Sequence, residues 1–193
     1  MNYVYKTLAV LLCLFVLIGV NTTWLEQQPK LALFGVLGMV LVFLTKPAAK
    51  RWADTWASRI VDYVLVAAAV LVFGYMFVQN EMLLQVFWLD EKSLGDRAGI
   101  ETATEFMLGG IGLVLVLEAT RRAIGWTLPI LCLIFIGYSY YGQQMPDWAM
   151  PHAGFKLKEI AQSSFLQGGV FGIALRIMFQ YVFLFVLFGT LLE

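Results

Sequence analysis

The residues of this chain that could do chemistry are a few charged side chains set within or beside long apolar segments. Glu118 precedes Arg121 and Arg122 by three and four residues, which is the spacing and order that favour ion pairs on one face of a helix. Asp62 and Glu105 stand where two apolar segments begin. There a carboxylate either meets the positive end of the helix dipole or binds a proton or a sodium ion. The pattern favours a structural cluster at Glu118 and stabilisation of helix ends at the other two carboxylates.

Three further features also have two interpretations. Arg176 lies about 9 Å along a helix from the start of the last apolar segment, at about 1.5 Å per residue. It either extends to the outer interface or pairs with an acid of another helix. Gly109-Gly110-x-Gly112 resembles part of a phosphate-binding loop, but its apolar setting predicts close helix packing. His152, the single histidine, is expected to be a solvated loop residue rather than a metal ligand.

Composition makes lipid the expected solvent of this chain. Of its 193 residues, 61% are hydrophobic and 13% are charged, against about 45–50% and about 25% in soluble domains. Thirteen basic residues balance thirteen acidic ones, so no positive excess is present to neutralise nucleic-acid phosphates. The two cysteines lie in apolar segments and predict no disulfide framework. The composition argues against a soluble enzyme and a nucleic-acid binder. No nucleophile–base set stands out, so we expect no enzyme activity, cofactor or metal site.

The apolar segments predict an all-α integral membrane protein with about six transmembrane helices, each near the roughly 20 residues that cross a bilayer. The predicted spans are Val4–Trp24, Leu31–Thr45, Ile60–Val78, Thr104–Ala119, Ala123–Tyr141 and about Val170–Leu192. The first could instead be a signal peptide, but no small-x-small cleavage site follows it, which favours a retained helix. Pro129 is expected to kink the fifth span.

Charge in the connectors predicts the orientation, because Lys and Arg gather in cytoplasmic loops. One side carries Lys6, Lys46, Lys50, Arg51, Arg59, Arg121 and Arg122. We therefore expect the N-terminus to be cytoplasmic. The opposite side carries most of the acids, and the candidate docking residues for a partner there are Glu81, Asp90, Glu91, Asp96, Glu101, Asp147 and His152. Beyond them, residues Phe155–Phe165 form either a short helix lying in the membrane interface or an irregular loop.

Two stretches are similar to the fused permeases of tripartite ATP-independent periplasmic (TRAP) transporters, and closest to their TAXI class. Residues Glu118–Pro129, EATRRAIGWTLP, resemble the hairpin motif of these permeases, and Val182–Glu193, VFLFVLFGTLLE, resembles an early helix of their large part. Between them, Gly142–Phe171 matches in layout. The likeness covers about residues 100–193. Residues 1–99 match only in having three spans and a basic second connector.

The resemblance implies a bacterial inner-membrane component of a secondary transporter. Residues 1–122 would be a four-helix region like the small subunit, and residues 123–193 would open the large permease region. A sodium gradient would drive uptake of an organic acid delivered by a periplasmic solute-binding protein, without ATP. Besides membrane lipids, the expected partners are that binding protein and the remaining large permease domain or subunit.

The chain also departs from the family. It stops at Glu193, before the helices that hold substrate and sodium in the relatives, so no binding residue is carried over. No basic residue follows the last span, which predicts a truncated or split permease, or a subunit completed by another chain. A non-transport membrane anchor or assembly subunit of a larger complex is the alternative.

Overall fold

The computed structural model describes residues 2–46, 56–88, 92–96, 102–146 and 150–192. The α-helices of this part are α1 (Asn2–Asn21), α2 (Gln27–Thr45), α3 (Trp56–Asn80), α4 (Ala103–Ile124), α5 (Thr127–Tyr140), α6 (Leu157–Ala161), α7 (Ile173–Ile177) and α8 (Phe183–Leu192). Two short 3₁₀ turns are η2 (Met82–Phe87) and η4 (Gly142–Gln144). Two π-helical turns are η6 (Gln162–Gln167), which continues α6, and η7 (Met178–Val182), which joins α7 to α8. The described residues contain no strand, as predicted.

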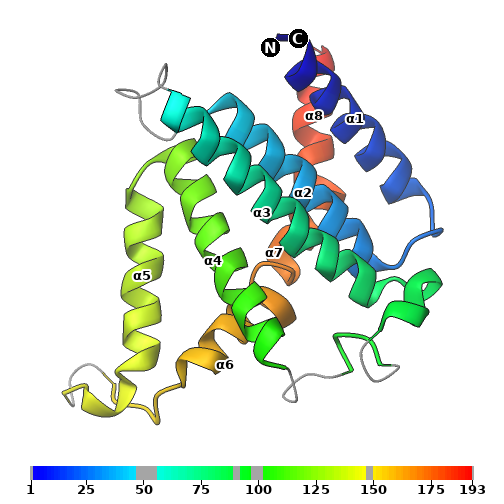
Figure 1. The fold of residues 1–193 in the computed structure, drawn as a ribbon. Helices are drawn as coiled ribbons and strands as arrows, with labels where there is room; N and C mark the ends of the chain where they lie inside the picture. The colour runs from blue at the N-terminus through cyan, green and yellow to red at the C-terminus, as the bar shows by residue number, and fades with distance from the viewer. Residues whose placement is uncertain (1, 47–55, 89–91, 97–101, 147–149, 193) are drawn as a thin grey trace.

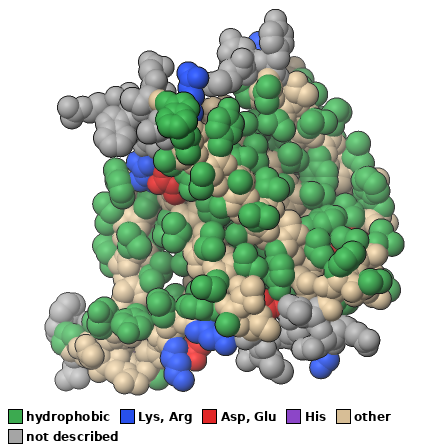
Figure 2. All heavy atoms as spheres, in the orientation of Figure 1, with side chains coloured by type: hydrophobic (Ala, Val, Ile, Leu, Met, Phe, Trp, Pro, Cys, Tyr) green, Lys and Arg blue, Asp and Glu red, His purple; other side chains and the backbone are tan. Residues whose placement is uncertain are grey.

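Five of these helical segments are long and apolar enough to cross a membrane. They are Val4–Asn21, Gln27–Thr45, Ser58–Asn80, Ala103–Ile124 and Ile173–Leu192. Helix α5, the predicted fifth span, has 14 residues and is therefore about 21 Å long, against a hydrocarbon core of about 30 Å. Figure 2 shows hydrophobic side chains across the middle of the visible face, with charged side chains toward its two ends. The protein is a multi-span, all-helical membrane protein.

The helices run up and down between two sides of the bundle (Figure 1). We call the side on which α1 and α3 begin and α2 and α4 end the Arg122 side, and the opposite one the Glu105 side. Helices α2 and α3 lie side by side through the centre, with α1 and α8 flanking them on one side and α4 and α5 on the other.

The ends of α4 follow from local sequence. Thr102 Oγ1 accepts a hydrogen bond from Glu105 N at 3.4 Å, and Glu105 Oε2 accepts one from Thr102 N at 2.6 Å. This capping box satisfies two N–H groups at the helix start and confirms the predicted helix-end role of Glu105. The helix ends at Gly125, whose φ of 106° favours a residue without a Cβ. Helix α5 starts two residues later, so the predicted tight hairpin is confirmed.

The predicted kink at Pro129 is wrong, because this residue is the third of α5 rather than an interior one. A proline in the first helical turn removes an N–H that would have no partner within the helix. The predicted fifth span started four residues too early, at Ala123, which belongs to the last turn of α4. Pro129 therefore lies in the first turn of α5 and not at a kink inside a span.

Aromatic side chains fill the centre of the bundle. The ring centroid of Phe73 on α3 lies 5.6 Å from that of Phe165 and 5.4 Å from that of Phe171. Phe165 and Phe171 are 5.4 Å apart in an edge-to-face arrangement, and all three rings are almost fully buried. Glycines make room for them, because a Cβ on Gly35 would overlap Phe73 and one on Gly112 would overlap Phe165. Small residues thus let large rings lie between helices.

The segment Leu157–Gln167 enters the bundle instead of lying in the membrane interface. Its short α6 is helical, as one of the two predicted alternatives required. However, Phe165 reaches Gly112, which is the tenth residue of the 22-residue α4. Gly109, one turn closer to the start of α4, packs against the Ala161 carbonyl and the Leu166 side chain. Two of the three glycines in the motif therefore provide the close helix packing that the sequence predicted.

This packing gives a matched test at two neighbouring glycines. Gly112→Ala should lower the free energy of unfolding by about 1–3 kcal/mol, because the added methyl overlaps a buried ring. Gly110→Ala should leave it unchanged or raise it slightly, because no atom lies within 4 Å of the added Cβ. Unfolding by SDS titration in mixed micelles measures both variants. Equal stabilities of the two would contradict the insertion of Phe165 against α4.

Candidate functional site

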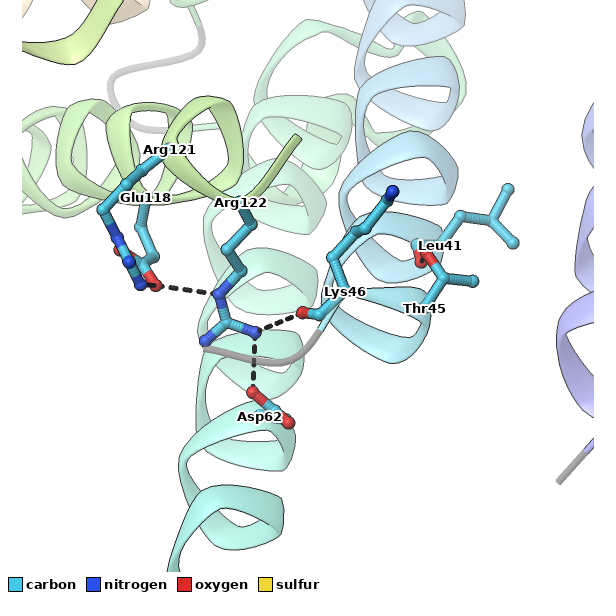
Figure 3. A network of polar contacts seen from close by, with 7 residues as sticks. All are labelled: Leu41, Thr45, Lys46, Asp62, Glu118, Arg121 and Arg122. Atoms are coloured by element: carbon cyan, nitrogen blue, oxygen red, sulfur yellow. Dashed lines mark hydrogen bonds and ion pairs between the residues drawn. The ribbon is translucent and has the colours of Figure 1, made fainter. Parts of the chain in front are cut away.

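The most concentrated polar structure in the described residues is a set of ion pairs on the Arg122 side, which we call the charge network: Asp62, Glu118, Arg121 and Arg122 (Figure 3). Two cations and two carboxylates balance within it. Its members come from α3 and from the last two turns of α4. The network lies where three long helices approach one another, and Arg122 is at its centre.

Arg122 joins three helices through one guanidinium group. Its Nη1 donates to Asp62 Oδ1 at 2.6 Å and to the carbonyl oxygen of Lys46, at the end of α2, at 3.1 Å. Its Nε donates to Glu118 Oε1 at 2.8 Å. The guanidinium carbon lies 5.1 Å from the ring centroid of Phe43, a cation–π distance. The arginine side chain is 0% exposed, so its charge depends on these partners.

Glu118 and Arg121 form the outer part of the network. Arg121 Nε and Nη2 each donate to a different Glu118 oxygen at 2.7 Å, which makes a bidentate pair. The two side chains are 21% and 23% exposed. The Arg121 guanidinium carbon also lies 5.2 Å from the Trp126 ring, just beyond the end of α4. The predicted local ion pairs of Glu118 with both arginines are confirmed.

The helix-end role predicted for Asp62 is wrong. Helix α3 begins at Trp56, and its first turn contains no acidic residue. Asp62 is instead 17% exposed and paired with Arg122, a contact across 60 residues of sequence. The hydropathy pattern located the apolar centre of the helix but not its first turn, Trp56–Arg59. The carboxylate was therefore placed about one turn too close to the end.

Glu105 is a fully buried carboxylate outside the charge network, and it is 0% exposed. Besides its part in the capping box, its Oε1 accepts a hydrogen bond from Tyr75 Oη on α3 at 3.1 Å. The group thus links the start of α4 to α3 on the Glu105 side. Arg176 is exposed on α7, and among the described residues no ion pair joins it to an acid. Within that part of the chain, the structure therefore lacks the predicted buried ion pair between Arg176 and an acid of another helix.

The candidate docking residues do not form one surface in the described residues. Glu81 is only 4% exposed, so it is wrong as a docking residue. Asp96 is exposed and accepts a hydrogen bond from Ser93 Oγ at 2.7 Å. Four others lie outside the described residues: Asp90, Glu91, Glu101 and Asp147.

His152, the last of the set, is not a solvated loop residue as predicted. It is half-buried, with its ring centroid 4.8 Å from that of Tyr138 and 6.1 Å from that of Phe155. Gly142 leaves the space beneath the ring, and Tyr138 Oη donates to the Met150 carbonyl at 2.9 Å. The aromatic residues near His152 were the available signal. A histidine among tyrosine and phenylalanine packs as an aromatic side chain.

Sequence reasoning missed the contribution of α2 to the charge network. The Lys46 carbonyl reaches Arg122 across 76 residues, and a backbone acceptor has no sequence signature. Among the described residues no three His, Cys, Asp or Glu side chains are grouped to hold a metal ion. The contacts of Arg122 support a role of the charge network in holding α2, α3 and α4 together.

Comparison with known proteins does not assign the chain to a family. No protein-family model, curated protein or solved structure matches the chain.

The two arginines give a second matched test. Arg122→Gln should lower the free energy of unfolding by about 3 kcal/mol, because it leaves Asp62 and Glu118 without their shared cation in a buried setting. Arg121→Gln should cost about 1 kcal/mol or less, because that pair is partly exposed and within one helix. SDS-titration unfolding of the purified protein measures both.

A double-mutant cycle separates the ion pair from a general effect of substitution. Asp62→Asn combined with Arg122→Gln should cost less than the sum of the single variants, because removing one partner already breaks the pair. Strict additivity would show that the ion pair between Asp62 and Arg122 contributes nothing to stability.

Proposed function

We propose that the chain is a membrane component of a secondary solute transporter in a bacterial inner membrane. In this proposal it takes part in sodium-coupled uptake of an organic acid that a periplasmic binding protein delivers. The observation that carries the proposal is the similarity of residues Glu118–Pro129 to the hairpin motif of TRAP permeases. Sodium and the organic acid are cargo here, and we assign no ligand of either to this chain.

The geometry of that hairpin supports the proposal. Its charged part, Glu118 with both arginines, forms the ion pairs that join α4 to α3 and to the end of α2. Its Gly125 and Pro129 make the tight return into α5. A motif that braces three helices suits a stationary part of a transporter, against which another part moves.

The exposed apolar helices also support an assembly with more membrane helices. In α5 every residue from Thr127 to Phe135 except Pro129 is exposed. In the most apolar stretch of the last span, Ile173–Leu192, only 6% of the residues are buried, against 17–33% in the other four spans. Both helices belong to the region that resembles the opening of the large permease part. In the proposal, they contact the remaining permease helices.

The alternative is a membrane anchor or assembly subunit without a part in transport. It needs the same spans and the same exposed apolar helices, so those features do not separate the two functions. Uptake does. A transporter component is required for movement of a solute, whereas an anchor is required only for recovery of its partner complex.

Deletion of the gene should abolish sodium-dependent uptake of at least one member of a panel of radiolabelled organic acids in the source cells. Expression of the chain from a plasmid should restore it, and a sodium ionophore should remove it because the gradient drives the movement. Uptake that is unchanged across the whole panel after deletion, together with loss of a co-purifying membrane complex, would establish the anchor instead.

The partner proposal has its own test in the acidic connector. Replacing Asp90, Glu91, Asp96 and Glu101 with lysine should reduce uptake that requires the binding protein by about fivefold or more. The reason is that a partner surface that pairs with acidic residues would be repelled by the lysines. Immunoblots of the membrane fraction control for the amount of protein. Normal uptake by this variant would exclude the connector as the docking surface.

A further inference from the structure

A cleft on the Arg122 side is the strongest unassigned feature of the molecule. It has a volume of about 700 Å³ and lies between the start of α1, the end of α2 and the start of α3. Most of its lining is apolar and includes Leu44, Tyr63 and Val66. Its charged lining residues are Lys46 at the end of α2, Arg59 in the first turn of α3 and Asp62 about one turn further along α3. The cleft is therefore two-part, with a cationic end and an apolar wall.

The charges of the cleft leave a positive excess. Lys46 and Arg59 are both exposed, and within the described residues neither forms an ion pair with a carboxylate. The lining also contains Asp62, but its Oδ1 binds Arg122 at 2.6 Å, so its charge is already balanced by the charge network. Two cations at one end of a cleft attract an anion.

The position of the cleft defines what kind of anion fits. Lys46 directly follows the span Gln27–Thr45, and Arg59 lies at the first turn of the span Ser58–Asn80. Both cations are thus at the depth of lipid headgroups. Val66 lies seven residues after Arg59, about 10 Å further along α3 toward the membrane centre, and Phe43 and Leu44 line the same cleft from α2. A small soluble anion would leave this apolar wall uncovered.

We propose that the cleft binds an anionic phospholipid, with the phosphate between Lys46 and Arg59 and an acyl chain along Leu44, Tyr63 and Val66. Basic pockets between membrane helices bind such headgroups. A zwitterionic lipid fits the wall equally well, but its ammonium group meets two cations. The site does not depend on the proposed transport function.

Lipid retention by the full-length protein tests the proposal. The protein is purified in mild detergent from vesicles of equal parts phosphatidylglycerol and phosphatidylcholine, and bound lipid is counted by native mass spectrometry. The wild type should retain phosphatidylglycerol preferentially. Lys46→Gln with Arg59→Gln should reduce that preference about 25-fold, since each basic side chain near an anionic headgroup contributes on the order of a fivefold effect. The matched control is the double variant Lys156→Gln with Lys158→Gln, which should retain the preference. Both lysines are exposed, at the start of α6 on the Glu105 side.

A second measurement uses the unaltered chain, so that a variant that fails to fold does not decide the question. A phosphatidylglycerol with a photoactivatable diazirine in its acyl chain should label the peptides that contain Leu44 and Val66. Unlabelled phosphatidylglycerol should compete, whereas phosphatidylcholine should not. Inorganic phosphate at 10 mM should not compete either, because it lacks the chain that the apolar wall holds.

Three results would overturn the proposal. Equal retention of both lipids by the wild type would remove the headgroup preference. Full competition by inorganic phosphate would define a soluble-anion site instead. Absence of labelling at Leu44 and Val66 in membranes where other residues are labelled would show that protein, rather than lipid, covers the cleft.

Discussion

A buried cation among apolar helices is the constraint on which this structure depends. Removing a guanidinium from water is costly unless carboxylates and hydrogen-bond acceptors replace the water. Arg122 finds these partners on three helices, in Asp62 of α3, Glu118 of α4 and the carbonyl of Lys46 at the end of α2. The positions of these helix ends are therefore coupled. Moving any one of them would leave charge without a partner in a medium that does not solvate it.

The centre of the bundle obeys a different rule, because lipid offers no hydrophobic drive for helices to associate. Association there relies on close contact, which glycines permit. Gly112 receives Phe165 and Gly35 receives Phe73, and the rings meet one another at centroid distances near 5.5 Å. This packing brings the segment Leu157–Gln167 into the membrane region. The charge network thus holds the last turns of α4 to α2 and α3, whereas the aromatic centre holds the middle of α4 to the segment Leu157–Gln167.

Local patterns predicted what local physics controls. The capping box at Thr102 and Glu105, the ion pairs of Glu118, and the close packing at Gly109 and Gly112 each follow from residues a few positions apart or from residue size. The errors lie where a contact crosses many residues. Asp62 meets Arg122 sixty residues away, and His152 packs between aromatic rings of two segments. The pairing of Asp62 with Arg122 is not visible from spacing alone, whereas the aromatic residues near His152 were a signal in the sequence.

By itself, the sequence determined that this protein is an all-helical membrane protein with several spans, because hydropathy and helix periodicity act along the chain. It also determined the short hairpin between α4 and α5 and the pairing of charges within it. The fold alone establishes which charges are buried, where α6 packs, and that, within the part of the chain that the structure describes, two cations without an ion pair border a largely apolar cleft. The physical reason is that burial depends on which helices meet. Lipid stabilises many arrangements of apolar helices almost equally, so a few polar contacts and ring-sized spaces select among them.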